Sequence, residues 1–219
     1  MAISKFNYNS FNVTPVAGAA LSFDADADGF STATSTALTH IKTLTASSSS
    51  TLSFVDGASD VVLDNTYPVY LFKFINVHPA TNSVYLKAGF RDGSTAYDAT
   101  KTTTSFVARH DEADTATSLA YTSADDLAQS TSAQIITGLI GNGNDESASG
   151  EMFLFNPSST TFTKHFIARA NTYDRNDRST NEYVAGYCNV TTAIDAVQFS
   201  MSSGNIDAGT IKLYGIKDS

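Results

Sequence analysis

Residues 67–77, YPVYLFKFINV, form a nearly continuous run of apolar and aromatic residues. A strand that is covered on both faces shows such a run instead of a regular alternation of apolar and polar residues. We therefore predict that residues 67–77 form a strand in the middle of a β-sandwich.

Alternation of apolar and polar residues dominates the chain on both sides of this run. It predicts strands with one buried face, because successive side chains of a strand point to opposite sides. Turn-forming pairs such as Asn142-Gly143 and Gly204-Asn205 separate several of the alternating stretches. These stretches are residues 41–45, 84–88, 105–109, 133–140, 151–155, 161–170, 183–190, 196–201 and 210–216.

Together the stretches predict an all-β protein, an antiparallel β-sandwich or jelly roll of about ten short strands. The one helical candidate is residues 123–129, SADDLAQ, with Ser123 as its cap. Residues 1–36 differ in composition from the rest of the chain, because Asn and aromatic residues alternate near their start and small residues follow. We expect an N-terminal arm or docking segment over residues 1–36 and the sandwich domain over residues 37–219.

The charge balance argues against nucleic acid and membranes as partners. The 219 residues include 13 Lys and Arg against 22 Asp and Glu, a formal net charge of −9. An acidic surface repels phosphate backbones and anionic lipids and favours basic or neutral partners. The first residues lack the apolar core of a signal peptide, and Cys188 is the single cysteine, so we expect synthesis in a reducing cytoplasm.

One acidic stretch, Asp24-Ala-Asp26-Ala-Asp28-Gly29, matches the first half of a calcium-binding loop. Its three carboxylates can converge on a hard cation, and the glycine permits a sharp turn. The position of the loop's bidentate Glu is occupied by Ser35, so a solvated acidic turn without a cofactor is the competing interpretation. The metal candidates are Asp24, Asp26 and Asp28, with Ca²⁺ as the cation.

Two other charged stretches are candidate sites. Residues 110–114 place His110 among three carboxylates, which predicts a metal or acid–base site or an exposed acidic loop. Residues 173–178 alternate Asp with Arg, which predicts a loop held by its own ion pairs or the rim of an interface. The interface candidates are Tyr173, Arg175 and Arg178, with Phe6, Tyr8 and Phe11 of the arm.

The sequence contains no motif for nucleophilic catalysis. It lacks a G-x-S-x-G elbow, a Cys–His arrangement and a phosphate-binding glycine loop. A pair of carboxylates for glycoside cleavage would leave no motif, because its members are usually far apart in sequence. We expect that the protein is not an enzyme.

The C-terminal third resembles a known family. Residues 196–201 lead into Ser203-Gly-Asn-Ile206, and residues 209–216, GTIKLYGI, follow close to the C-terminus. This pattern resembles the final hairpin, the closing strand pair, of jelly-roll virion proteins from tailed bacteriophages, especially those of marine and cyanobacterial hosts. The resemblance extends to three earlier stretches, residues 52–54, 70–75 and 150–156.

The resemblance implies a structural protein of the phage particle, assembled in the host cytoplasm. The implied role is a head decoration or cement subunit that associates with itself, with a trimer as the expected form. Its other partners would be the major capsid protein or other virion proteins. The alternative is a tail fibre or receptor-binding module whose Tyr and Phe side chains bind host surface glycans. The resemblance implies no catalytic residues.

Overall fold

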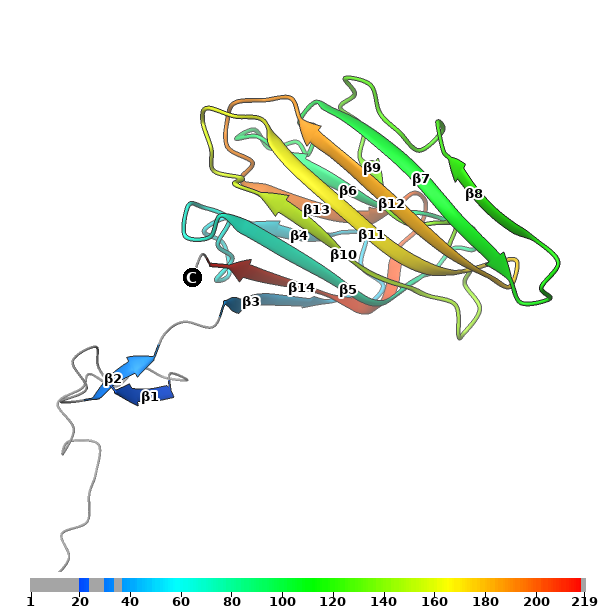
Figure 1. Cartoon of the computed structure of the whole chain (residues 1–219), viewed down its shortest axis with the longest axis horizontal. Coiled ribbons are helices and arrows are strands. Elements are labelled where there is room, and N and C mark those ends of the chain that lie inside the picture. The colour runs from blue at the N-terminus through cyan, green and yellow to red at the C-terminus, as the bar shows by residue number, and fades with distance from the viewer. Residues whose placement is uncertain (1–19, 24–29, 34–36, 218–219) are drawn as a thin grey trace, which may run out of the picture. The chain divides into compact units, whose positions relative to one another are not determined.

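The computed structural model describes residues 20–23, 30–33 and 37–217 (Figure 1). The chain divides into two compact units, Met1–Ala37 and Leu38–Ser219. In the first unit β1 (Ala20–Phe23) pairs antiparallel with β2 (Phe30–Ala33). The second unit contains the other twelve strands, and no described residue of either unit lies in a helix.

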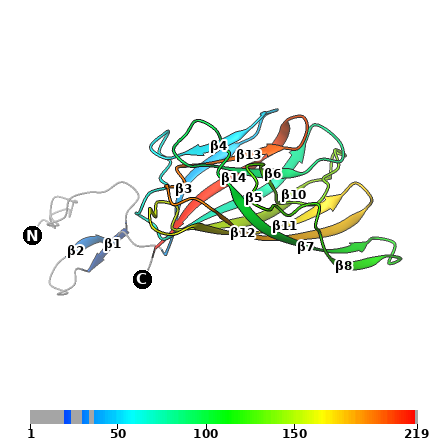
Figure 2. The ribbon, with the colours of Figure 1, turned by 90° about the horizontal axis from the view of Figure 1, so that it is seen from above.

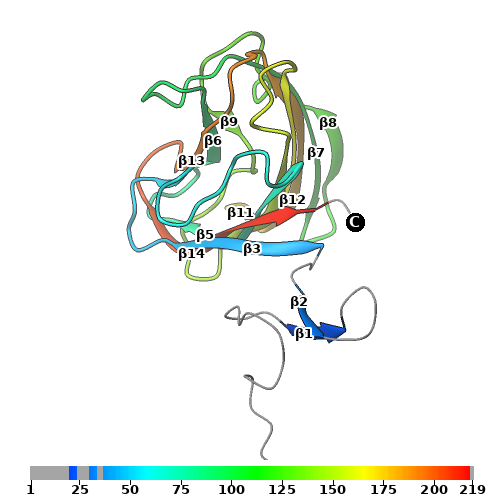
Figure 3. The ribbon, with the colours of Figure 1, turned by 90° about the vertical axis from the view of Figure 1, so that its left-hand side faces the viewer.

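The second unit is a sandwich of two antiparallel sheets, seen as two layers in Figures 2 and 3. The larger sheet has eight strands, in the spatial order β3 (Leu38–Thr45), β14 (Ile206–Ile216), β5 (Val69–Pro79), β10 (Ala148–Phe155), β11 (Lys164–Asp174), β12 (Arg178–Cys188), β7 (Lys101–Asp111) and β8 (Thr117–Tyr121). The smaller sheet has four strands, in the order β4 (Leu52–Val55), β13 (Ala196–Met201), β6 (Leu86–Arg91) and β9 (Gln134–Ile135). The all-β antiparallel sandwich that alternation predicts is thereby confirmed, and β8 is a strand that alternation did not mark.

Eight of the strands have the order of a jelly roll. The strands β3, β14, β5 and β10 lie side by side in one sheet, and β4, β13, β6 and β9 form the other. The chain passes from one sheet to the other between β3 and β4, between β4 and β5, and between β5 and β6. It does so again between β9 and β10 and between β13 and β14. Such connections define the jelly roll. The two remaining pairs, β7 with β8 and β11 with β12, extend the larger sheet beyond β10.

The last two strands, β13 and β14, do not form the closing hairpin that the resemblance implies. β13 belongs to the smaller sheet and β14 to the larger one, so the two do not pair with each other. The chain crosses between the sheets through Gly204, whose φ of 71° favours glycine and where a side chain would collide with Thr81. β14 then pairs with β3 and β5. Residues 196–216 therefore close the sandwich across its two layers.

A cluster of buried phenylalanines joins the two sheets. The ring of Phe199 on β13 lies edge-on against Phe72 and Phe74 of β5, with ring centroids 5.4 and 5.2 Å apart. Phe54 of β4 packs against Phe199 at 6.2 Å. Edge-to-face ring pairs at such distances contribute beyond the burial of their area. The run 67–77 supplies two of these rings, and its strand β5 lies between β14 and β10, as predicted.

The predicted helix at residues 123–129 does not form, and the backbone makes turns there instead. Other segments bind the groups that a helix would use. The N–H of Leu127 donates to Oγ1 of Thr103 at 2.8 Å, and the carbonyl of Asp125 accepts from Nε2 of Gln134 at 2.7 Å. These tertiary hydrogen bonds outweigh the weak helical propensity of a short segment.

We predict that Phe199→Ala destabilises the sandwich by about 3–5 kcal/mol, because it removes a buried ring that bridges the two sheets and leaves a cavity. Thermal unfolding followed by circular dichroism measures the loss. The matched control is Phe162→Ala, since the Phe162 side chain is 70% exposed in a loop. A loss at Phe199 no larger than the loss at Phe162 would contradict the central place of the ring cluster.

Candidate functional site

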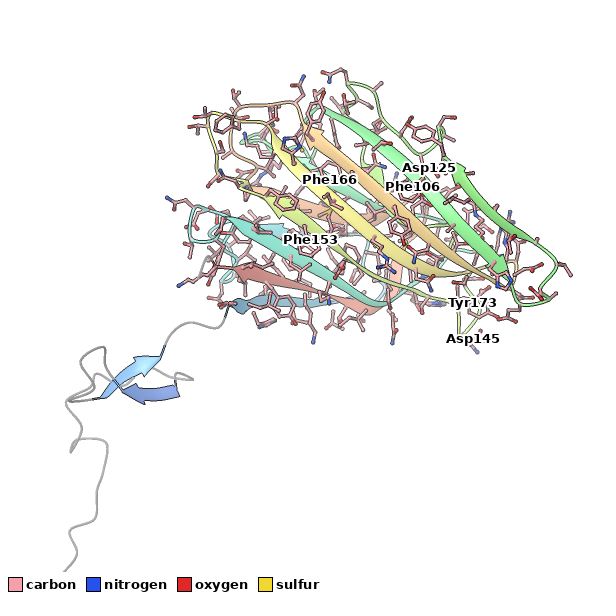
Figure 4. The ribbon with its side chains drawn as sticks, in the orientation of Figure 1. Phe106, Asp125, Asp145, Phe153, Phe166 and Tyr173 are labelled. Atoms are coloured by element: carbon pink, nitrogen blue, oxygen red, sulfur yellow. The ribbon has the colours of Figure 1, made fainter. Side chains whose placement is uncertain are left out.

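The face of the larger sheet that points away from the smaller sheet carries an apolar patch. In one row across the strands, Tyr183 of β12 lies opposite Phe106 of β7. In the next row, Ile167 of β11 lies between Phe153 of β10 and Ala185 of β12. We call these five residues the outer-face patch, and Figure 4 shows Phe106 and Phe153 on their strands.

The alternation of side chains along the strands sets the direction of the patch. Phe166 and Val184 are buried in the core, so their neighbours Ile167 and Tyr183 point outward. Ile167 is 50% exposed and Phe106 is 43% exposed. The other three members, Phe153, Tyr183 and Ala185, are partly exposed. Contiguous apolar side chains that stay accessible on a folded protein are typical of surfaces that bind another molecule.

A hollow of about 300 Å³ lies within the patch. The small side chains of Ala185 and Thr104 line it together with the larger members of the patch. A second, more polar hollow shares Glu151 and Arg169 with the first and includes Asn181. An apolar centre with a polar border is the composition of a protein interface.

Two of the three aromatic rings of the patch, those of Phe106 and Tyr183, stack on each other. The rings of Phe106 and Tyr183 are nearly parallel, at 4°, with centroids 4.7 Å apart. The guanidinium carbon of Arg169 lies 5.4 Å from the centroid of the Tyr183 ring. These residues occupy successive strands in one register row, so Tyr183 lies between Phe106 and Arg169. Both faces of the Tyr183 ring are therefore already in contact with this chain.

The predicted interface residues Tyr173, Arg175 and Arg178 lie at the turn between β11 and β12. Nη2 of Arg178 binds Oδ2 of Asp174 at 3.0 Å, and the Asp174 side chain is almost fully buried. Desolvation and the charges of nearby carboxylates, Asp177 among them, raise the pKa of Tyr173 to about 12. Arg175 is exposed. The structure thus supplies the internal ion pair that the charge alternation predicted, and it leaves Arg175 open to a partner.

The other predicted candidates are placed as follows. Asp24, Asp26 and Asp28 of the calcium candidate, and Phe6, Tyr8 and Phe11 of the arm, lie outside the described residues. At the turn after β7, Nε2 of His110 lies 3.0 Å from Oδ1 of Asp114, and both side chains are exposed. Within residues 20–23, 30–33 and 37–217, no group of three or more His, Cys, Asp and Glu side chains is placed to hold a metal ion.

A buried carboxyl group lies on the inner face of the same strands. Oε1 of Glu182 accepts a hydrogen bond from the hydroxyl of Ser105, and the residue is 1% exposed. Burial raises the pKa of Glu182, the charge of Asp125 raises it further, and the Ser105 hydrogen bond and Arg109 oppose this shift. The group lies across the sheet from the outer-face patch and lines none of the hollows described above.

The single thiol is also buried. Cys188 lies in register between Lys164 of β11 and Lys101 of β7. Nζ of Lys101 donates to the carbonyl of Ala99 at 2.7 Å, and Nζ of Lys164 donates to that of Val190 at 3.0 Å. Burial raises the pKa of the Cys188 thiol to about 12, so it stays protonated and unreactive.

Sequence reasoning missed the outer-face patch, although a signal for it is present. In residues 166–168 and 183–185 both the inward and the outward positions are apolar, so the alternation of a half-buried strand is broken. The predicted strands had no assigned order across the sheet. Phe106 and Tyr183 are 77 residues apart in the sequence, and only the pairing of β7 with β12 brings them side by side.

Comparison with known proteins identifies no relative. No family model, no curated protein and no solved structure matches this chain. Among the described residues, no helix is long and apolar enough to cross a membrane.

We predict that Glu182→Gln stabilises the protein at neutral and alkaline pH. Because the pKa of Glu182 is raised by folding, its ionised form costs stability above the unfolded pKa, and the cost reaches its full size above the folded pKa. The uncharged amide avoids this cost, so its advantage should be present at pH near 8 and vanish as the pH falls toward 4.5, the ordinary pKa of a glutamate side chain.

Melting temperatures measured across this pH range test the prediction. For a domain of this size, each kcal/mol of added unfolding free energy raises the melting temperature by about 2–4 °C. The control is Glu151→Gln, which neutralises a partly exposed carboxylate paired with Lys73 at 3.5 Å. Equal stabilisation by both substitutions, or an advantage of Glu182→Gln that grows toward acid pH, would contradict the buried charge as the cause.

Proposed function

We propose that this chain is a structural subunit of a tailed-phage particle, a decoration or cement protein of the head. The observation that carries the proposal is the outer-face patch, which gives a sandwich of this size an apolar surface for another protein. In this role the protein strengthens the shell by binding its subunits and its own neighbours.

Three features support the proposal. The strand order is that of a jelly roll, an architecture used in viral capsid domains, although it also serves lectins and enzymes. The closing strands that carry the resemblance to phage virion proteins are internal strands, β13 in the smaller sheet and β14 in the larger one. The most strongly buried carboxyl and thiol groups, Glu182 and Cys188, are enclosed in the protein, where a substrate does not reach them.

The patch suits attachment by many weak contacts. Its apolar centre can be buried against a partner, while the net charge of −9 favours a basic or neutral partner. A subunit that is held on a lattice at many points binds more firmly than each contact alone would allow. One modest patch per subunit is then sufficient for firm attachment to the shell.

The alternative is a tail fibre or receptor-binding module for host glycans. The exposed Phe106 and the neighbouring Asn181 favour it, because sugars stack on aromatic rings and bind amides. The occupied faces of Tyr183 count against it, since Phe106 and Arg169 leave that ring no free face for a sugar. We therefore place the decoration role first.

In purified particles we predict that this chain is present in numbers comparable to the major capsid protein, as measured by quantitative mass spectrometry.

We also predict that the full chain carrying Ile167→Glu binds the particle at least about tenfold more weakly, because a charge in the patch must be desolvated on docking. The control is Phe162→Glu, which adds the same charge at an exposed site outside the patch. A handful of copies confined to the tail, or equal binding by the two variants, would contradict the proposal.

A further inference from the structure

The strand β8 forms an open edge of the larger sheet. It pairs with β7 on one side, from Phe106 opposite Tyr121 to His110 opposite Thr117, and it is the last strand in the sheet order. All five of its residues are exposed. Figure 1 shows β8 at the margin of the sheet with no described strand on its other side.

The hydrogen-bond pattern shows which backbone groups this edge offers. The N–H of Thr122 donates to the carbonyl of Ser105 at 3.0 Å, and the N–H of Asp111 donates to that of Ala116 at 3.2 Å. Because bonded and non-bonded pairs alternate in an antiparallel ladder, residues 118 and 120 bond to β7. The N–H and C=O groups of residues 117, 119 and 121 therefore point to the open side.

This edge lacks the features that normally prevent strand addition. Its sequence, TSLAY, has no charge and no proline, and its pairing with β7 has no bulge. At the opposite edge of the same sheet, β3 carries Lys42 and has a register shift against β14. The edges of the smaller sheet are short, with four residues in β4 and two in β9. Of the four sheet edges of the sandwich, β8 is the one that carries none of these features.

We propose that β8 pairs with the β8 strand of a second copy of this chain, antiparallel about Leu119. Leu119 then lies opposite Leu119 of the second copy, and Thr117 lies opposite Tyr121 of the second copy. The three residues whose backbone groups point outward, 117, 119 and 121, are the ones that this register joins. The edge is thus complementary to itself, as a two-fold interface requires.

The side chains support the same register. Tyr121 and Phe106 are directly paired, so Thr117, Leu119 and Tyr121 lie on the same face of the sheet as the outer-face patch. Leu119 is 75% exposed and Tyr121 is 59% exposed, and pairing removes part of this apolar area from water. The joined sheet carries two outer-face patches on one side. Pairing therefore doubles the apolar surface that the molecule offers on that side.

Area and charge set the strength of the pair. Five residues per copy bury much less than the roughly 800 Å² per partner of a standard interface, so the pair is weak in solution. The acidic turn at Asp111, Glu112 and Asp114 lies at one end of β8, and Asp126 follows its other end. An antiparallel pair brings these ends close, so salt should strengthen it by screening their repulsion. A lattice that concentrates copies compensates for the weak affinity.

The inference goes beyond the proposed function, because it needs only a second copy of the chain and no phage shell. A two-fold pair uses the open edge of both copies. The trimer implied by the resemblance would therefore need another surface.

Sedimentation velocity of the full chain over a range of concentrations tests the pair. We expect a reversible monomer–dimer equilibrium that is tighter at about 0.5 M than at about 0.05 M salt. Leu119→Lys should weaken the association constant at least about tenfold, because it places a charge at the centre of the pair. Leu38→Lys makes the same change on the opposite edge strand, at a residue that is 46% exposed, and should leave association unchanged.

A second variant, Thr117→Pro, removes one outward N–H without adding charge and should also weaken the dimer. Melting temperatures equal to that of the parent chain establish that both variants fold. A monomer at every concentration, a trimer, or a dimer that Leu119→Lys leaves intact would overturn the inference. These outcomes are independent of the copy number in particles, so the inference and the proposed function fail separately.

Discussion

The contact of Phe199 with Phe72 and Phe74 is the constraint on which the rest of the sandwich depends. It joins β13 of the smaller sheet to β5 of the larger sheet, and both strands are internal to their sheets. β5 in turn pairs with β10, from which β11, β12, β7 and β8 extend in order. The ring cluster fixes β5, and the strands that pair in series from β5 to β8 then fix the positions of the outer-face patch and of the β8 edge.

The added strands explain why the molecule has an apolar surface at all. Their inward residues, such as Phe166 and Val184, complete the core, whereas their outward residues Ile167 and Tyr183 lie on the face that the smaller sheet does not cover. Stacking of Phe106, Tyr183 and Arg169 covers some of this surface within the sheet. We propose that a partner buries the part that remains exposed. The function that we propose depends on this arrangement and on no catalytic group.

The sequence permitted the prediction of the fold class but not of the candidate site. Residues 67–77 and the alternating stretches predicted the strands because the hydrophobic effect acts on each strand locally. Residues 123–129 were mispredicted because Thr103 and Gln134, which bind that segment, come from elsewhere in the chain. The stack of Phe106 on Tyr183 depends on the order of the strands, which no local pattern contains. The edge β8 was missed because TSLAY is exposed on both faces and therefore does not alternate.

The proposed role is tested most directly by a cryo-EM reconstruction of purified phage particles that contain this chain, at a resolution that shows the orientation of its jelly roll. The account predicts that the outer face of the larger sheet, with Phe106, Ile167 and Tyr183, is turned toward the shell and buried there. A particle in which this face points to solvent, while the smaller sheet or the loops make the attachment, would contradict it.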